Sequence, residues 1–208
     1  TVIGSNRLTI EDEVVNLSSL PHEFELLYHC NFGPPFLGRG SRLSVPTRLI
    51  APRDLHAASE SAVSESYDGP IAGYVERCYW YEPIGDDTGE TLALLRDVDG
   101  EVGAVIRFNT GQLPCFTQWK NIGAESDGYV TGLEPGTDYP NPKPFEREQG
   151  RLMTLPAYGS HRATVALEVL DTPAAVAAAE AEIAVLQARA DRLIHGQPLP
   201  THSPKEAL

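Results

Sequence analysis

The chain has 208 residues, of which 41% are hydrophobic and 22% are charged, a composition typical of one globular domain rather than of a disordered or membrane-embedded chain. Its formal net charge of −13 disfavours contact with phosphate backbones and anionic membrane surfaces, so we expect no nucleic-acid and no membrane partner. The 17 prolines and 18 glycines favour short strands joined by turns over a helix bundle. A mainly β fold is therefore predicted.

The cysteines are few and widely spaced. Cys30, Cys78 and Cys115 include no CxxC pair, a pattern that predicts neither a zinc site nor a disulfide framework. Reduced thiols in a cytoplasmic protein are the expectation, and the sequence has no signal-peptide pattern. The chain begins with Thr1 inside a folded-looking stretch, which is expected if it was processed or if an N-terminal half is missing.

The first 81 residues predict short strands separated by loops. Residues 1–20 predict two strands on either side of an acidic break, Glu11-Asp12-Glu13. Residues 24–28 predict a strand that leads to His29 and to the turn formed by Gly33, Pro34 and Pro35. The small polar stretch 53–70 predicts an exposed loop, and residues 74–81 predict a strand that Pro83 ends.

The clearest local prediction is a hairpin. The apolar runs 91–96 and 102–108 flank Asp97-Val98-Asp99-Gly100, and Asp-Gly between two such runs is typical of a hairpin turn. Further strands are predicted at 113–119, at 128–134 before Pro135-Gly136, and at 151–155 and 161–170.

A C-terminal helix is predicted after the strands. Thr172 is a favourable N-cap before Pro173, and an apolar stripe at helical spacing follows, ending before Gly196. The predicted organisation is a β-sandwich over residues 1–171, a helix over 172–195 and a flexible tail over 196–208.

Motif searches exclude several kinds of site. The six histidines show no HxH or HxxxH spacing, so no metal site is predicted. The sequence also has no GxSxG, P-loop or GxGxxG motif, so neither a serine hydrolase nor a nucleotide-binding site is indicated, and no cofactor is expected.

Three segments carry side chains suited to chemistry. An apolar run delivers His29 into a Gly/Pro turn, where it can act as a general acid or base. On the 113–119 strand, alternation places Gln118 and Lys120 on one face and Trp119 on the other, and polar donors near an indole suit a sugar. Glu134 ends an apolar strand, where a carboxylate is costly unless it has partners or a role.

Together these segments, LLYHCNFGPP, LPCFTQWKNIG and YVTGLEPGT in that order, resemble the C-terminal part of the aldose 1-epimerase (galactose mutarotase-like) superfamily, and in particular its DUF4432-type branch. The resemblance runs from about Leu8 to about Leu170. It implies a large antiparallel β-sandwich, with an α-helix added at the C-terminus here, that binds monosaccharides in an open cleft.

The resemblance also implies roles for single residues. His29 corresponds to a general acid toward the sugar ring oxygen, and Glu134 to a general base on the anomeric hydroxyl. The candidate substrate-binding residues are Asn31, Glu76, Gln118, Trp119 and Lys120. Relatives take an arginine and another histidine from their N-terminal part, and nothing before His29 matches these two.

Three functions are consistent with the sequence. The first is an isomerase that interconverts the anomers of a monosaccharide or sugar derivative without a cofactor. The second is a non-catalytic carbohydrate-binding domain on the same scaffold. The third is a subunit or fragment completed by a partner chain that covers the missing N-terminal half, or by a second copy in a homo-oligomer.

Overall fold

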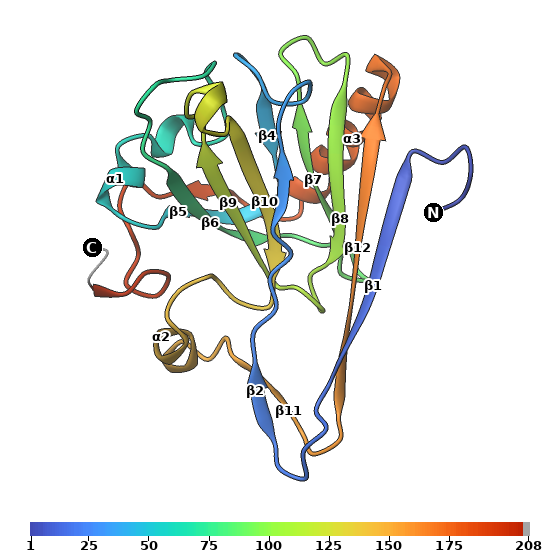
Figure 1. Ribbon diagram of the computed structural model, residues 1–208, viewed down its shortest axis with the longest axis vertical. Coiled ribbons are helices and arrows are strands. Elements are labelled where there is room, and N and C mark those ends of the chain that lie inside the picture. Colours follow the sequence, from blue (N-terminus) through green and yellow to red (C-terminus); the bar gives the residue numbers. More distant parts are fainter. Residues whose placement is uncertain (206–208) are drawn as a thin grey trace.

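Two mainly antiparallel sheets stack face to face in this protein (Figure 1), whose computed structural model describes residues 1–205. The five-stranded sheet has the order β1-β12-β8-β7-β4 and the six-stranded sheet the order β13-β5-β6-β9-β10-β3, while β11 pairs with β2. This arrangement confirms the predicted mainly β, antiparallel sandwich.

The strands of the five-stranded sheet are β1 (Arg7–Val15), β12 (Ser160–Leu170), β8 (Gly103–Asn109), β7 (Glu90–Arg96) and β4 (Arg42–Ser44). Those of the six-stranded sheet are β13 (Leu193–Ile194), β5 (Thr47–Pro52), β6 (Arg77–Pro83), β9 (Cys115–Asn121), β10 (Val130–Gly136) and β3 (Cys30–Phe32), and the small pair is β11 (Met153–Leu155) with β2 (His22–Phe24).

The main core lies between the two sheets. Phe116 of β9 stacks on Phe108 of β8 with ring centroids 5.9 Å apart, and Tyr79 and Tyr81 of β6 are buried beside them. Full burial of one such aromatic side chain contributes roughly 1.5–3 kcal/mol. Because side chains alternate along a strand, the intervening residues of β6, β9 and β10 lie on the opposite face of the six-stranded sheet. That outer face holds the candidate site.

The predicted helix forms but ends earlier than expected. Helix α3 spans Pro173–Gln187, and the Thr172 side chain caps it by accepting a hydrogen bond from the Ala175 amide. Its apolar stripe packs on the outer face of the five-stranded sheet, against residues such as Leu92. The helix stops at Gln187, whose side-chain amide bonds both backbone groups of Thr47. No helix within residues 1–205 is long and apolar enough to cross a membrane.

The segment after α3 is packed where a flexible tail was predicted. Residues 193–194 form β13, which pairs in parallel with β5. His202 and Ser203 are buried, and the Ser203 hydroxyl accepts a hydrogen bond of 3.0 Å from the indole N–H of Trp80. The helix is therefore shorter than the predicted 172–195, and the segment after it is packed against the sheet as far as residue 205. The division of the chain into domains stays a prediction.

Strand boundaries near the N-terminus also differ from expectation. Residues 7–15 form one strand, β1, rather than two, because β1 lies at a sheet edge where its acidic side chains remain exposed or paired, as Glu13 is with Arg162. The strand predicted over 24–28 is instead β2, followed by a single bridge from Leu27 to Gly136. The predicted hairpin is confirmed as β7 and β8.

The 53–70 stretch is more ordered than a surface loop. It contains the helix α1 (Leu55–Ala58) and the 3₁₀ turn η1 (Ser61–Val63), and Tyr67 within it is buried. Its backbone carbonyls accept hydrogen bonds from the side chains of Gln118 and Lys120. The segment therefore covers polar groups on the inner side of the six-stranded sheet. The remaining described helices are α2 (Lys143–Glu148) and the 3₁₀ turn η2 (Glu125–Asp127).

Candidate active site

A cavity of about 170 Å³ opens on the outer face of the six-stranded sheet. It is built where β5, β6, β9 and β10 lie side by side, with the chain before β3 crossing one edge. The residues that line it are Leu27, His29, Arg53, Glu76, Cys78, Trp80, Thr117, Trp119, Glu134 and Pro140. Most of these side chains can donate or accept a hydrogen bond or stack, which makes the cavity a polar site with aromatic walls.

His29 and Glu134 meet in this cavity. The Nε2 atom of His29 lies 3.0 Å from Oε1 of Glu134. Strand pairing fixes this contact, since Cys30 is in register with Leu133 and the Tyr28 amide donates to the Pro135 carbonyl. The two partners differ in environment: 49% of the His29 side chain is exposed but only 3% of the Glu134 side chain. A half-open imidazole beside a buried carboxylate is a typical acid–base arrangement.

Burial tunes the Glu134 carboxyl. Loss of solvent, with a smaller contribution from the nearby negative charge of Glu76, raises the pKa of Glu134 to about 7. Its Oε1 is buried and, within residues 1–205, forms no hydrogen bond, because the contact with His29 lacks hydrogen-bond geometry. The carboxyl is therefore free to exchange a proton near neutral pH.

Gly132 makes room for that carboxyl. It lies two residues before Glu134 on the same face of β10, and a Cβ atom added there would collide with Oε1 of Glu134 and lie 3.2 Å from Cβ of Trp119. Only a glycine leaves this space open. Gly132 thus lets the Glu134 carboxyl keep its position beside His29, and a larger residue would make that carboxyl move.

Contacts with charged side chains hold Trp119 in place. Its indole N–H donates a 2.6 Å hydrogen bond to Oε2 of Glu76, and Arg53 lies 3.7 Å from Oε1 of the same carboxylate. The Trp119 ring also meets the His29 ring edge-on, with centroids 5.5 Å apart. Arg53 further donates to Sγ of Cys78, a thiol whose pKa burial raises to about 12. The aromatic wall is therefore pre-positioned.

Thr117 adds an unpaired polar atom. It is in register with Glu134 on the neighbouring strand, is 1% exposed, and its hydroxyl has no hydrogen-bond partner among the residues that the structure describes. A buried hydroxyl without a partner is unfavourable in an empty cavity. It is available to a bound ligand.

The structure brings four of the seven predicted residues together: His29, Glu76, Trp119 and Glu134. It does not bring in the other three. Gln118 and Lys120 are buried on the opposite face, where Gln118 bonds Tyr67 and Tyr81 and Lys120 bonds the Ser66 carbonyl. Asn31 is exposed on β3 and does not line the cavity.

Six of the ten residues that line the cavity were not predicted as site residues, and Thr117 and Arg53 are the two of these that the proposal below uses. Thr117 could have been found, because it lies two positions before Trp119 and so shares its face. Arg53 had no such signal, since it follows Pro52 at a strand end and fell inside the predicted loop. Among residues 1–205, no three His, Cys, Asp or Glu side chains are grouped to hold a metal ion. The expectation of a site without metal or cofactor stays a prediction.

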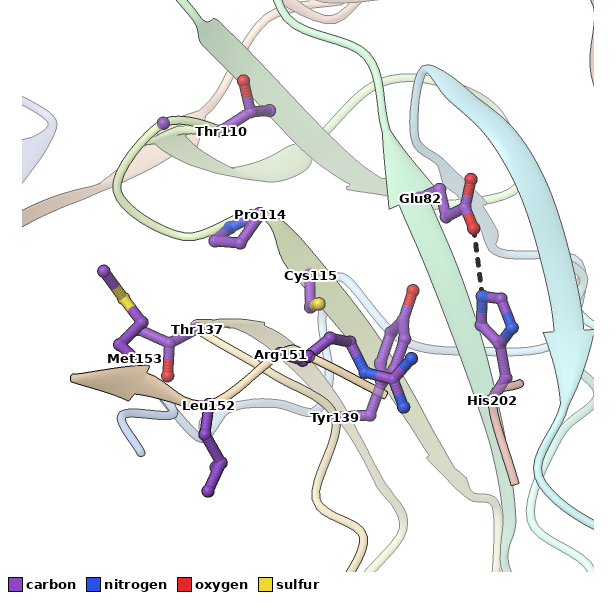
Figure 2. A pocket seen from close by; sticks show the side chains of 12 residues that line it. Glu82, Thr110, Pro114, Cys115, Thr137, Tyr139, Arg151, Leu152, Met153 and His202 are labelled. Carbon is purple, nitrogen blue, oxygen red and sulfur yellow. Dashed lines mark hydrogen bonds and ion pairs between the residues drawn. The ribbon is translucent and has the colours of Figure 1, made fainter. Parts of the chain in front are cut away.

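A larger pocket of about 420 Å³ lies elsewhere and contains a second His–Glu contact (Figure 2). His202 Nε2 is 3.0 Å from Oε1 of Glu82, while Nδ1 lies 2.9 Å from the Thr201 hydroxyl. Across the pocket, the Arg151 guanidinium lies over the Tyr139 ring and pairs with the buried Glu146. Every one of these groups already has a partner, so we do not assign this pocket a catalytic role.

Comparisons with solved structures identify the class of fold. The sandwich matches the structure of a candidate aldose 1-epimerase from Klebsiella pneumoniae with a TM-score of 0.93 and 36% identity, covering 96% of this chain and 52% of that one. A galactose mutarotase-like protein from Clostridium acetobutylicum matches with a TM-score of 0.54 at 20% identity (79% and 52% covered). A galactose mutarotase related enzyme from Lactobacillus acidophilus does so with a TM-score of 0.54 at 13% identity (80% and 58% covered). The fold is therefore galactose mutarotase-like, as predicted.

The family follows from the sequence. The profile of a domain of unknown function, DUF4432, matches residues 1–169, and the chain belongs to this family. No curated protein matches the chain significantly. The chain spans about half the length of the solved structures described above.

Proposed function

We propose that this chain interconverts the anomers of a monosaccharide or sugar derivative by cofactor-free acid–base catalysis. The observation that most supports this is the 3.0 Å contact between His29 and Glu134 inside a cavity with an indole wall. The ring oxygen and the anomeric hydroxyl of a pyranose are bonded to the same carbon. An acid and a base that act on both must therefore lie side by side, as these two side chains do. The 36% identical relative from Klebsiella pneumoniae, described as a candidate aldose 1-epimerase, supports the same reaction.

The proposed reaction balances without an added reagent. Ionised Glu134 removes the proton from the anomeric hydroxyl as the bond between C1 and the ring oxygen breaks, and protonated His29 delivers a proton to that oxygen. The open aldehyde turns about its C1–C2 bond. The ring oxygen then attacks the other face of the carbonyl, returning its proton to His29, and the new anomeric oxygen takes back the proton from Glu134. Only the configuration at C1 has changed.

The remaining cavity side chains bind rather than react in this proposal. The Trp119 indole supplies a flat surface for the C–H face of a sugar. The Glu76 carboxylate, the Arg53 guanidinium and the Thr117 hydroxyl offer acceptors and donors for sugar hydroxyls. Gln118, Lys120 and Asn31 lie outside the cavity, so the proposal gives them no contact with the sugar.

Anomer exchange on a sugar panel tests the proposal. Freshly dissolved α-anomers of aldoses and aldose derivatives are mixed with wild type or Glu134→Gln, and equilibration is followed by polarimetry or proton NMR. We expect wild type to accelerate at least one sugar beyond the buffer rate, and Glu134→Gln to lose about 10²–10⁴-fold of that acceleration. Equal rates for wild type, variant and buffer across the whole panel would refute the catalytic claim.

A non-catalytic carbohydrate-binding domain is the second candidate. It is favoured by the fixed position of Trp119, whose bond to Glu76 does not involve the His–Glu pair. This alternative predicts that a sugar raises the melting temperature of both wild type and Glu134→Gln, that Trp119→Ala abolishes the rise, and that no anomer exchange is accelerated.

Location and partners are inferred more generally. The three cysteines are free thiols, which supports a cytoplasmic location. Edge strand β1, exposed along most of its length, supports either a homo-oligomer or a partner chain that covers it. Size-exclusion chromatography with light scattering measures the oligomeric state directly, and a monodisperse monomer would oppose the homo-oligomer.

A further inference from the structure

A second cavity adjoins the candidate active site. It measures about 340 Å³, and Leu27 and Pro140 line both cavities. Its polar residues are Glu25, Asp138 and Asn141. The first cavity alone, at about 170 Å³, is smaller than the roughly 300–1,000 Å³ of most ligand sites, whereas the two together fall inside that range.

The second cavity contains a buried carboxyl with a free oxygen. Asp138 is 5% exposed, its Oδ1 accepts a 3.3 Å hydrogen bond from Thr137, and its Oδ2 has no hydrogen-bond partner anywhere in residues 1–205. Burial, followed by hydrogen bonding with the neighbouring Glu25 carboxyl, raises the pKa of Asp138 to about 7, so Glu25 is the group nearest to a partner for this acid and no other side chain donates to Oδ2 within the described residues. Leaving such an oxygen unpaired costs about 1–3 kcal/mol, so the fold alone gives no reason to keep it.

The cations near this carboxyl are already engaged. Lys143 lies 3.6 Å from Glu25, and Arg151 pairs with Glu146 rather than with Asp138. The Asn141 side-chain amide donates to Glu146 and to the His202 carbonyl, which fixes its orientation. What Asp138 lacks is a hydrogen-bond donor, and the hydroxyl groups of a sugar are donors of that kind.

The two carboxyls lie close together in the chain but line different cavities. Asp138 follows Glu134 by four residues, a separation of at most about 14 Å between their Cα atoms. Glu134 lies on β10, and Asp138 lies in the bend that follows the end of this strand at Gly136. Leu27 and Pro140 stand between the two cavities, so a ring held by His29 and Glu134 does not fill the second one.

We propose that the second cavity binds a second sugar unit through Asp138 and Glu25, so that the preferred ligand is the reducing end of a disaccharide or longer saccharide. This inference rests on the proposed function, since it assumes that the first cavity holds the reducing ring. It assigns Asp138 and Glu25 to specificity, with no part in proton transfer.

Binding and turnover are measured separately to test it. Calorimetry on the non-turning-over Glu134→Gln protein compares reducing disaccharides (maltose, cellobiose and lactose) with glucose, their common reducing unit. Exchange NMR then compares the same sugars with wild type. We expect at least one disaccharide to exceed glucose by about tenfold in affinity and in kcat/KM. The variants Asp138→Asn and Glu25→Gln should each reduce that ratio to less than about threefold.

Asp99→Asn is the matched control, because Asp99 is exposed in the β7–β8 turn and lines neither cavity. This variant should keep the full preference for the disaccharide over glucose. Thermal melts show whether Asp138→Asn remains folded. If it does not, Glu25→Gln, with a side chain that is 33% exposed in wild type, decides the question. Glucose binding as tightly as every disaccharide, or a ratio that survives in the folded variants, would overturn the inference. Disaccharide-selective binding without any accelerated exchange would support the subsite and refute the proposed catalysis instead.

Discussion

The protein contains two His–Glu contacts of equal length, and their surroundings are reversed. In the His29–Glu134 pair the histidine is half exposed and the acid is buried, whereas in the His202–Glu82 pair the histidine is 9% exposed and the acid 44%. The acid pKa values move accordingly. Burial raises the pKa of Glu134, while the hydrogen bond from His202 lowers that of Glu82. The distance between two such side chains therefore does not reveal their role, but the identity of the buried partner does.

Hydrogen bonding separates the two pairs as well. Both ring nitrogens of His202 have partners, Thr201 and Glu82, so this imidazole joins the C-terminal segment to β6. Glu134 instead keeps an oxygen without a hydrogen bond within the described residues. The His202–Glu82 pair is fully hydrogen-bonded, whereas the His29–Glu134 pair leaves a buried carboxyl oxygen that the proposed function assigns to a ligand.

Replacing each histidine should have opposite consequences. We expect His29→Gln to lower kcat/KM for anomer exchange by about 10²–10⁴-fold, because it removes the proton donor, and to change the free energy of unfolding by less than about 0.5 kcal/mol. His202→Gln should leave the exchange rate nearly unchanged and destabilise the fold by about 0.5–1.5 kcal/mol, since the buried imidazole loses its hydrogen bonds to Thr201 and Glu82. NMR exchange and urea titration measure the two effects. Loss of activity in both variants would remove the distinction.

A methyl group at position 132 should disrupt the contact between His29 and Glu134 without unfolding the chain. In Gly132→Ala the new Cβ takes the space of the Glu134 carboxyl, which must turn away from His29. We expect a loss of about 10–100-fold in kcat/KM with a cooperative melt retained. Gly196→Ala is the control, because a Cβ there meets no atom within 4 Å. Wild-type activity in Gly132→Ala would show that the carboxyl position is not critical.

The pH dependence should report the buried acid. Because Glu134 acts as a base only when ionised and its pKa is about 7, kcat/KM should rise about tenfold per pH unit below that value, until the need for protonated His29 limits the rate at higher pH. A profile without a break between about pH 6 and 8 would contradict this assignment. His202→Gln, outside the cavity, should keep the wild-type profile.

The two glutamates should also differ in how their contributions to stability depend on pH. The pKa of Glu134 is higher in the folded chain than its ordinary 4.5, so its favourable contribution is complete below about pH 4.5 and is lost as pH rises through about 7. Glu134→Gln should therefore be more stable than wild type at pH 8 by up to about 3 kcal/mol, and equal to it at pH 4. Glu82 has a lowered pKa, so its contribution is present at neutral pH and is lost on acidification. Glu82→Gln should destabilise by less than about 1 kcal/mol at pH 8, since the side chain is half exposed.

Chemical denaturation of the two glutamate variants at several pH values measures these differences. A Glu134→Gln protein that is less stable than wild type at pH 8 would mean that a partner compensates the buried charge.

Much of this architecture could be predicted because the determining signals are local. Asp99-Gly100 set the β7–β8 turn, and Thr172-Pro173 set the start of α3. The end of α3 depends on a contact between Gln187 and Thr47, far apart in the chain, and no local pattern announces it. Edge position likewise explains how β1 tolerates three consecutive acids that were interpreted as a break.

The residues of the candidate site likewise differ in whether a local sequence signal predicts them. His29 and Glu134 were found through motifs, and the structure places them in contact. Gln118 and Lys120 were chosen for their nearness to Trp119 in sequence, yet adjacent residues of a strand face opposite sides of the sheet. Arg53 directly follows β5 and Asp138 lies in the bend after β10, so each reaches its cavity from a strand end whose surroundings only the folded topology sets.

The bond between Trp80 and Ser203 has a practical consequence for anyone who shortens the chain. Trp80 forms part of the cavity wall, and its indole is held by a residue 123 positions later in the sequence. A truncation placed after α3, where the regular secondary structure largely ends, would release that ring from behind and enlarge the cavity. Expression boundaries and affinity tags are therefore best placed beyond residue 205, so that Ser203 continues to hold the Trp80 side chain in the cavity wall.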